Sequence, residues 1–402
     1  MKKAATFEFP YQYEIIFGLL CVFSTVMFRP NELPLEPYNL YLYFMNYMED
    51  GFLAKGFIGT IVTSIFEKMD ERTFYIMYGC ILGFVFLFFL FFIGEVVRIR
   101  KKENELFMVY LGSVLCFAPC SVTVFTGREM FGSQELFLVF FFLASMVLLY
   151  KRKGYGALLP FSIIAVLVDE RYILTYLPAV LVFLFYQNKK EKKNSKWTLF
   201  YTIGGCCGVL AVILRFFLKS SEKDASTFYQ TLMGRTSINL TWDNSSLKKA
   251  LYTIYCDYFT GMKDWFSFRT MTGTDYRIFV ISLILCIPVI LFLGWIWFLF
   301  IKNSRMKGIA ILFPAVILLS APLFLFGSDY GWNLIRILFV QLITVFSLIG
   351  IEDSAMISAI CDIKAKFQKH QWLFWILPVY LLLLGDIDGQ GMTFAYLIQA
   401  LF

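Results

Sequence analysis

Apolar runs of helical length alternate with short polar connections along the whole chain. A hydrocarbon core of about 30 Å requires about 20 apolar residues in a helix. The runs that meet or approach this length number about eleven, and the predicted spans are residues 11–28, 74–97, 105–125, 131–150, 155–168, 172–187, 197–218, 277–301, 308–326, 332–350 and 372–385. The pattern predicts an all-α fold, a polytopic bundle of transmembrane helices.

The charges in the connections predict the orientation of the bundle. Five basic clusters fall in alternate connections, around residues 98–102, 151–153, 189–196, 302–307 and 364–370. With the N-terminus in the cytoplasm all five face the cytoplasm, as the positive-inside bias requires. The first run follows Lys2 and Lys3 and has no small-residue cleavage site, so we expect it to remain as a helix. The predicted location is a cell membrane, crossed many times.

Composition supports lipid as the solvent. The chain is 59% apolar and 16% charged, whereas soluble domains are about 45–50% apolar and 25% charged. The net charge of +7 does not indicate nucleic acid, because the basic residues flank apolar runs. The nine cysteines lack zinc spacing and fall mostly in those runs, and the one histidine, His370, lies in a basic connection. Acid–base chemistry on the outer side would therefore depend on Asp, Glu, Tyr or Lys.

Two outer connections are long enough to fold. Residues 29–73 have apolar and aromatic positions spaced as in interfacial amphipathic helices, and residues 219–276 form a polar segment sufficient for a small helical cap. Residues 155–168 and 172–187 are short and flank Asp169-Glu170-Arg171 with almost no loop. We expect these charges to be recessed in a water-filled cavity, because lipid-exposed charge is costly. Residues 1–402 are predicted to form one integral membrane domain.

Ionisable residues gather near the membrane at four places on the predicted outer side. Lone interfacial charges are often only solvated, and Arg128 could simply snorkel, but ionisable groups within a membrane are functional candidates by default. Arg336 lies about two turns beyond Asp329, so the two can share a helix face. The four places are Glu49-Asp50 with Lys55, Gly127-Arg128-Glu129, Asp169-Glu170-Arg171, and Asp329-Tyr330-Gly331 with Arg336.

These motifs resemble those of polytopic proteins from bacterial polysaccharide loci (capsule, O-antigen or exopolysaccharide). The acidic pair is followed by Gly-Phe-x-x-Lys-Gly-Phe-Ile-Gly, and Asp169-Glu170 precedes Tyr176-Leu177-Pro178. Two positions depart from the family, because Asp169 stands where it has His and Trp332 stands where it has Arg. The layout also resembles membrane glycosyltransferases of the GT-C type, which carry an acid in a first outer loop of interfacial helices.

The resemblance implies a glycosyltransferase or polysaccharide polymerase in the bacterial cytoplasmic membrane. Its partners would be a polyprenyl-phosphate-linked sugar donor and a glycan acceptor, and it could join a polysaccharide assembly complex. Asp50 is the expected base, because Glu49 can raise its pKa by repulsion. Glu49, Asp169 and Glu170 are the other expected catalytic residues, and Asp169 and Glu170 could also bind sugar hydroxyls or orient Arg171. The expected substrate-binding residues, with arginines as phosphate clamps, are Lys55, Arg128, Arg171, Asp329 and Arg336.

Other functions stay open at this point. No cofactor is expected, although a site rich in Asp could hold Mg²⁺ or Mn²⁺. A flippase for lipid-linked oligosaccharide, or another transporter, would also use charges within the membrane and broken helices. A non-catalytic component of an assembly complex is a third class.

Overall fold

The computed structural model describes residues 37–50, 55–117, 122–126, 130–191, 196–217, 225–238, 273–326 and 330–370, together with Tyr380 and Ile398. Within these residues every regular element is a helix, and the only extended pairing is an isolated bridge between Met69 and Thr236. The prediction of an all-α protein is confirmed. The predicted spans 11–28 and 372–385 lie outside the described residues, except for Tyr380.

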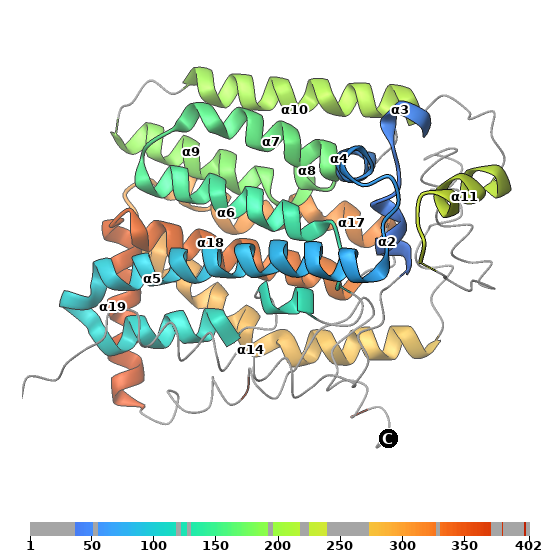
Figure 1. Cartoon of the computed structure of the whole chain (residues 1–402). Coiled ribbons are helices and arrows are strands. Elements are labelled where there is room, and N and C mark those ends of the chain that lie inside the picture. Colours follow the sequence, from blue (N-terminus) through green and yellow to red (C-terminus); the bar gives the residue numbers. More distant parts are fainter. Residues whose placement is uncertain are drawn as a thin grey trace, which may run out of the picture.

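Long helices lie side by side and make the body of the molecule (Figure 1). Four described stretches are long and apolar enough to cross a membrane, at Glu71–Arg98, Tyr276–Asn303, Lys307–Phe324 and Gly331–Gly350. They support a membrane protein, and the count of eleven stays a prediction. The main helices are α5 (Glu71–Phe117), α6 (Glu135–Lys151), α7 (Leu158–Val168), α8 (Tyr172–Thr175), α9 (Leu177–Glu191), α10 (Lys196–Phe217), α14 (Gly273–Asn303) and α18 (Tyr330–Gly350).

Two stretches differ from the predicted spans. Helix α5 continues through the polar residues between spans 74–97 and 105–125, and its ribbon turns sharply at the left of Figure 1. The run 308–326 is divided into short pieces, because Pro314 and Pro322 lack an N–H group and clash with the preceding turn. These pieces are α15 (Lys307–Ala310), α16 (Leu312–Ala315), a 3₁₀ turn (Val316–Ser320) and α17 (Ala321–Phe326).

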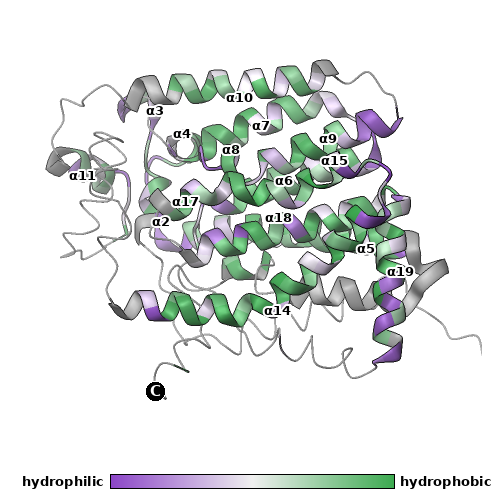
Figure 2. Cartoon of the chain, turned by 180° about the vertical axis from the view of Figure 1, so that it is seen from behind, coloured by the Kyte–Doolittle hydropathy of each residue, from purple (hydrophilic) through white to green (hydrophobic). Residues whose placement is uncertain are grey.

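The exposed side chains of the outer helices are largely apolar. Leu87 on α5 and Leu291 on α14 are each 66% exposed, and Figure 2 shows that α14 consists mostly of hydrophobic residues. The central helix α18 is different, because 89% of its apolar stretch is buried within the protein. Apolar surface on this scale, facing outward, is suited to lipid rather than water.

One end of the bundle collects the basic connections. Lys151 pairs with Glu95 at 3.4 Å, and Arg152 pairs with Glu191 at 2.9 Å. Lys190 lies 2.5 Å from Asp353, which caps α19 (Ser354–Lys369) by accepting from the N–H groups of Ala355 and Met356. These pairs join the middle of α5 and the ends of α6 and α9 to the start of α19. The basic clusters of separate connections thus meet at one end, which the positive-inside bias assigns to the cytoplasm.

Short helices cover the opposite end (Figure 1). They are α2 (Pro37–Leu42), α3 (Tyr47–Asp50), α4 (Gly56–Ile65) and α11 (Ala225–Gly234). Helix α4 has apolar residues on both faces, because Ile58 and Val62 are buried while Ile61 and Ile65 are exposed. Gly59 lets α4 approach the turn after α2, since a Cβ there would overlap the carbonyl oxygens of Leu42 and Met45. Short helices lie within the predicted outer loop 29–73, whose place at the membrane interface stays a prediction, and most of the predicted cap 219–276 lies outside the described residues.

Candidate functional site

Three groups of charged side chains lie at the end opposite the basic clusters. The Asp169 cluster consists of Lys55, Asp169, Glu170 and Arg171. The Asp50 cluster consists of Glu49, Asp50 and Arg235. The Glu135 cluster consists of Glu135, Tyr176, Asn333 and Arg336. Each cluster joins segments that are distant in sequence.

The Asp169 cluster forms at the break between α7 and α8. Helix α7 ends at Val168, and Asp169 has extended backbone angles that turn its side chain out of the helical register. The Arg171 Nε donates to both carboxylate oxygens of Asp169 at 2.9 Å, and the Lys55 Nζ lies 3.7 Å from Oδ2. Asp169 is 3% exposed, whereas Arg171 is 25% exposed. The buried Asp169 carboxylate therefore holds two cations, of which Arg171 is the more exposed.

The two carboxyl groups of this cluster have opposite pKa shifts. Burial disfavours the charge of Asp169, but the nearby Arg171 and Lys55 cations hold the pKa of Asp169 well below its usual range. Burial raises the pKa of Glu170, and the Asp169 charge adds to that effect. The Lys55 and Arg171 cations and a backbone N–H only partly offset this rise of the Glu170 pKa. Two adjacent acids thus differ in role, because one is committed to cations and the other favours a proton.

Lys55 and Tyr47 bring the first outer segment to this break. Lys55 precedes α4 with a φ of 61°, a left-handed conformation that a residue with a Cβ adopts only when its surroundings require it. The Tyr47 hydroxyl donates to the Leu167 carbonyl at 3.4 Å, and its backbone N–H donates to the Thr60 hydroxyl at 2.9 Å. Burial and the Glu170 carboxylate raise the pKa of the Tyr47 hydroxyl. Helices α3, α4 and α7 therefore meet around Glu170.

The Asp50 cluster ties α3 to the segment after α11. Arg235 donates through Nη1 to Asp50 Oδ2 at 2.5 Å and through Nη2 to Oδ1 at 3.0 Å. The same Nη2 donates to Glu49 Oε2 at 2.6 Å. The Asn46 N–H also donates to Asp50. The expected base is thus buried and bound to a guanidinium in this conformation.

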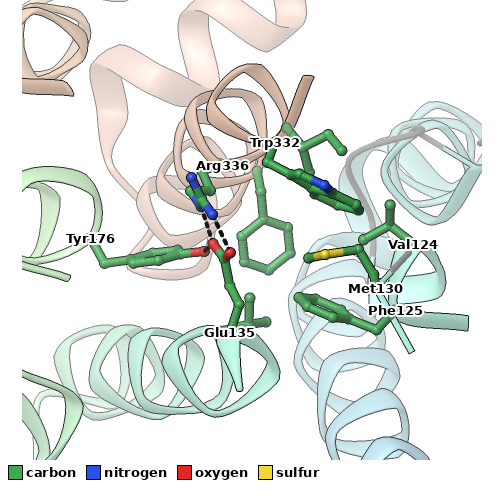
Figure 3. Close-up of a pocket in the computed structure, with 10 residues that line it drawn as sticks. Val124, Phe125, Met130, Glu135, Tyr176, Trp332 and Arg336 are labelled. Carbon is green, nitrogen blue, oxygen red and sulfur yellow. Dashed lines mark hydrogen bonds and ion pairs between the residues drawn. The ribbon is translucent and has the colours of Figure 1, made fainter. Parts of the chain in front are cut away.

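The Glu135 cluster is buried between the starts of α6 and α18 (Figure 3). Arg336 donates to both oxygens of Glu135 and to the Asn333 side chain, and the Tyr176 hydroxyl donates to Glu135 at 3.2 Å. Both charged side chains are 4% exposed or less. They line a pocket whose other walls are apolar or aromatic, formed by Val124, Phe125, Met130, Val139, Trp332, Ile335 and Phe339.

The structure brings together part of the predicted site. Lys55, Asp169, Glu170 and Arg171 form one cluster, Glu49 and Asp50 form another, and Arg336 lies in the third. Arg128 and Asp329 lie outside the described residues, so the expected face shared by Asp329 and Arg336 is untested. In the described part of the chain no three His, Cys, Asp or Glu side chains converge as metal ligands would.

Glu135 and Arg235 were not predicted from the sequence, although they pair with the predicted site residues Arg336 and Asp50. Glu135 lies inside the predicted span 131–150, so the rule that flags ionisable residues within membranes would have selected it. Arg235 gives no comparable signal, because it is one of several charges in a polar segment and its pairing with Asp50 is long-range. Comparisons of the chain with protein-family models, curated proteins and solved structures find no match.

Proposed function

We propose that this protein is a membrane glycosyltransferase that uses a sugar linked to a polyprenyl phosphate, and that it acts at the end of the bundle opposite the basic clusters. One observation carries the proposal. Lys55 and Arg171 are held by the buried Asp169 at a break between short apolar helices, beside a Glu170 carboxylate with a raised pKa. Cations beside an available base are what transfer from a phosphate leaving group requires.

The cations serve the leaving group. A lipid-linked donor places its phosphate at the membrane surface, and the departing phosphate gains negative charge as the sugar–oxygen bond breaks. Arg171 can give bidentate contacts to such a group. Asp169 keeps the two cations in place and lowers the cost of holding two positive charges close together. Of the three arginines expected to clamp phosphate, Arg336 is committed to Glu135 and Arg128 lies outside the described residues.

The acids serve the acceptor. The acceptor hydroxyl oxygen forms a bond to the anomeric carbon, while the bond from that carbon to the phosphate oxygen breaks and its electron pair leaves with the phosphate. The hydroxyl proton passes to a carboxylate. Glu170 is the better candidate in this conformation, because a raised pKa brings a carboxylate closer to the operating pH. Asp50, the base expected from the sequence, is bound by Arg235.

A transfer assay with matched variants tests the proposal. Protein in nanodiscs would be given a panel of undecaprenyl-phosphate and undecaprenyl-diphosphate sugars, with released undecaprenyl phosphate or diphosphate as the readout. We expect Glu170→Gln to lower the rate by about 10²–10⁴-fold, the usual contribution of a general base, and Arg171→Ala to abolish donor binding. Controls are Glu71→Gln and Arg277→Ala, two exposed residues at the starts of α5 and α14, which should keep wild-type rates.

Other outcomes would point to other functions. Movement of the intact lipid-linked sugar between leaflets, without release of the carrier, would replace the proposal by a flippase. Normal turnover in both Glu170→Gln and Arg171→Ala would refute the site assignment. Absence of turnover and of donor binding with every sugar in the panel would favour a non-catalytic role in an assembly complex.

A further inference from the structure

Arg235 is fixed at its backbone and charged at its tip. Its carbonyl accepts from the Met69 N–H at 3.5 Å, and two residues later the Ser237 N–H donates to the Met69 carbonyl at 3.2 Å. This short bridge attaches residues 235–237 to the start of α5. The Arg235 side chain can therefore change partners by rotating about its own bonds, while the segment that carries it stays in place.

The present partners do not satisfy the guanidinium fully. Arg235 contacts Asp50, Glu49 and the Phe44 carbonyl, but its Nε is buried and has no hydrogen-bond partner among the described residues. The side chain is 10% exposed. A buried donor without a partner is destabilising. This cost is a reason for a second arrangement of the side chain in which another acceptor is present.

Among the described residues, the charges around Arg235 are unbalanced. Within this part of the chain the Asp50 cluster has two carboxylates for one cation, whereas the Asp169 cluster has Lys55 and Arg171 around Asp169 and the proton-favouring Glu170. Tyr47 belongs to the same short helix as Asp50 and interacts electrostatically with Glu170, so the two clusters adjoin. Lys55 also follows Asp50 by only five residues, so a phosphate bound at Lys55 and Arg171 would compete with Asp50 for Arg235.

We propose that Arg235 is a third phosphate-binding cation, which exchanges between the Asp50 carboxylate and the phosphate of a membrane lipid carrier so that ligand binding releases Asp50. This inference rests on the proposed function, since it takes the phosphate to be that of the sugar donor. It gives Asp50 and Glu49 a defined role in the unliganded protein, where they keep the arginine charged and in place. Released Asp50 then faces the bound sugar with its carboxylate available.

The experiment compares the affinity of nanodisc-embedded variants for undecaprenyl phosphate, measured by native mass spectrometry. Arg235→Ala should weaken binding by at least about tenfold, because a charge-assisted hydrogen bond is worth about 1.5–3 kcal/mol. Asp50→Asn should tighten binding by about tenfold, because it removes the competing acceptor. Glu49→Gln, at a 62% exposed side chain, should tighten it less and is not expected to disturb folding.

The double variant Arg235→Ala/Asp50→Asn separates exchange from simple repulsion. If Asp50 acts by holding Arg235, the tightening seen in Asp50→Asn disappears when Arg235 is absent. If the tightening persists there, Asp50 only repels the anion and the exchange is refuted. Weakening by both Asp50→Asn and Glu49→Gln would assign the cluster a structural role and would also refute the exchange.

Two further comparisons distinguish failure of this inference from failure of the proposed function. In one outcome, Arg171→Ala weakens binding while Arg235→Ala and Asp50→Asn have no effect. That result would overturn this inference alone and leave the proposed function standing. A wild-type protein that does not bind undecaprenyl phosphate would overturn both. Inorganic phosphate is tested in parallel, and the same pattern of variant effects with it would support exchange with a free anion rather than a lipid headgroup. Glu71→Gln should leave both affinities unchanged.

Discussion

Replacing Glu135 by glutamine leaves Arg336 as a buried cation without its counter-ion. Both side chains are 4% exposed or less, so solvent cannot compensate for the lost charge. Removing one partner of a buried pair costs about 3–5 kcal/mol. The glutamine oxygen can still accept one hydrogen bond, and the Asn333 oxygen still accepts from Arg336. We therefore expect a loss near the lower limit, about 3 kcal/mol of the free energy of unfolding.

The same substitution at the other end of the bundle is a matched control. Glu95 is 24% exposed and its partner Lys151 is 41% exposed. Exposed ion pairs contribute about 0–1 kcal/mol, so Glu95→Gln should cost no more than about 1 kcal/mol. Unfolding in mixed micelles by increasing the fraction of sodium dodecyl sulfate, followed by circular dichroism, gives both free energies. Equal losses in the two variants would refute the reasoning from burial.

A double replacement tests whether the pair itself stabilises the fold. Glu135→Leu with Arg336→Met fills a similar volume with apolar groups, and such exchanges of buried pairs are neutral or stabilising by about 1–4 kcal/mol. This double replacement also leaves the Tyr176 hydroxyl and the Asn333 oxygen without these partners, so we expect this variant to lose less than the two single variants added together. A loss equal to that sum would refute the idea that the uncompensated charge is the main cost.

The remaining predictions concern Glu170 and Gly59. Folding raises the pKa of Glu170, so ionising this group destabilises the folded protein as the pH rises above the unfolded pKa of about 4.3. Glu170→Gln should therefore raise the free energy of unfolding at pH 7, and the gain should vanish below pH 4 in the same micelle titration repeated across pH. A lower free energy of unfolding at pH 7 would contradict the raised pKa. Gly59→Ala should destabilise the fold by about 1–3 kcal/mol, because the new Cβ overlaps two backbone carbonyls. Gly79→Ala has open space around it and should stabilise slightly or have no effect. Equal melting temperatures of the two variants would refute the packing argument.

The sequence predicts the helices better than it predicts the partners of the charged residues. Apolar runs bounded by basic residues locate α6, α10, α14 and α18 to within a few residues, because lipid requires each run to satisfy its own backbone. The near absence of a loop between residues 155–168 and 172–187 indicated the break at Asp169, and the structure has short helices there. These features depend on local composition, which a single sequence shows directly.

The remainder depends on contacts between distant segments. Pairing of Arg336 with Glu135 requires the starts of α6 and α18 to meet, and pairing of Arg235 with Asp50 brings together residues 185 positions apart. Neither meeting has a local signal. The turn in α5 was expected to fall in a loop, but its polar residues are good helix formers and the helix continues through them.

The shortness of α7 has a consequence for the bilayer if this segment crosses the membrane, as the sequence predicts. With its preceding 3₁₀ turn the segment Tyr155–Val168 has fourteen residues, which span about 21 Å at about 1.5 Å per residue. The hydrocarbon layer beside it is about 30 Å thick, and a span shorter than the layer thins it locally. Asp169 and its neighbours would then lie at the floor of a dimple in the membrane. Hydrophobic mismatch would make the protein sensitive to acyl-chain length, with longer chains raising the energy needed to keep this floor open to water.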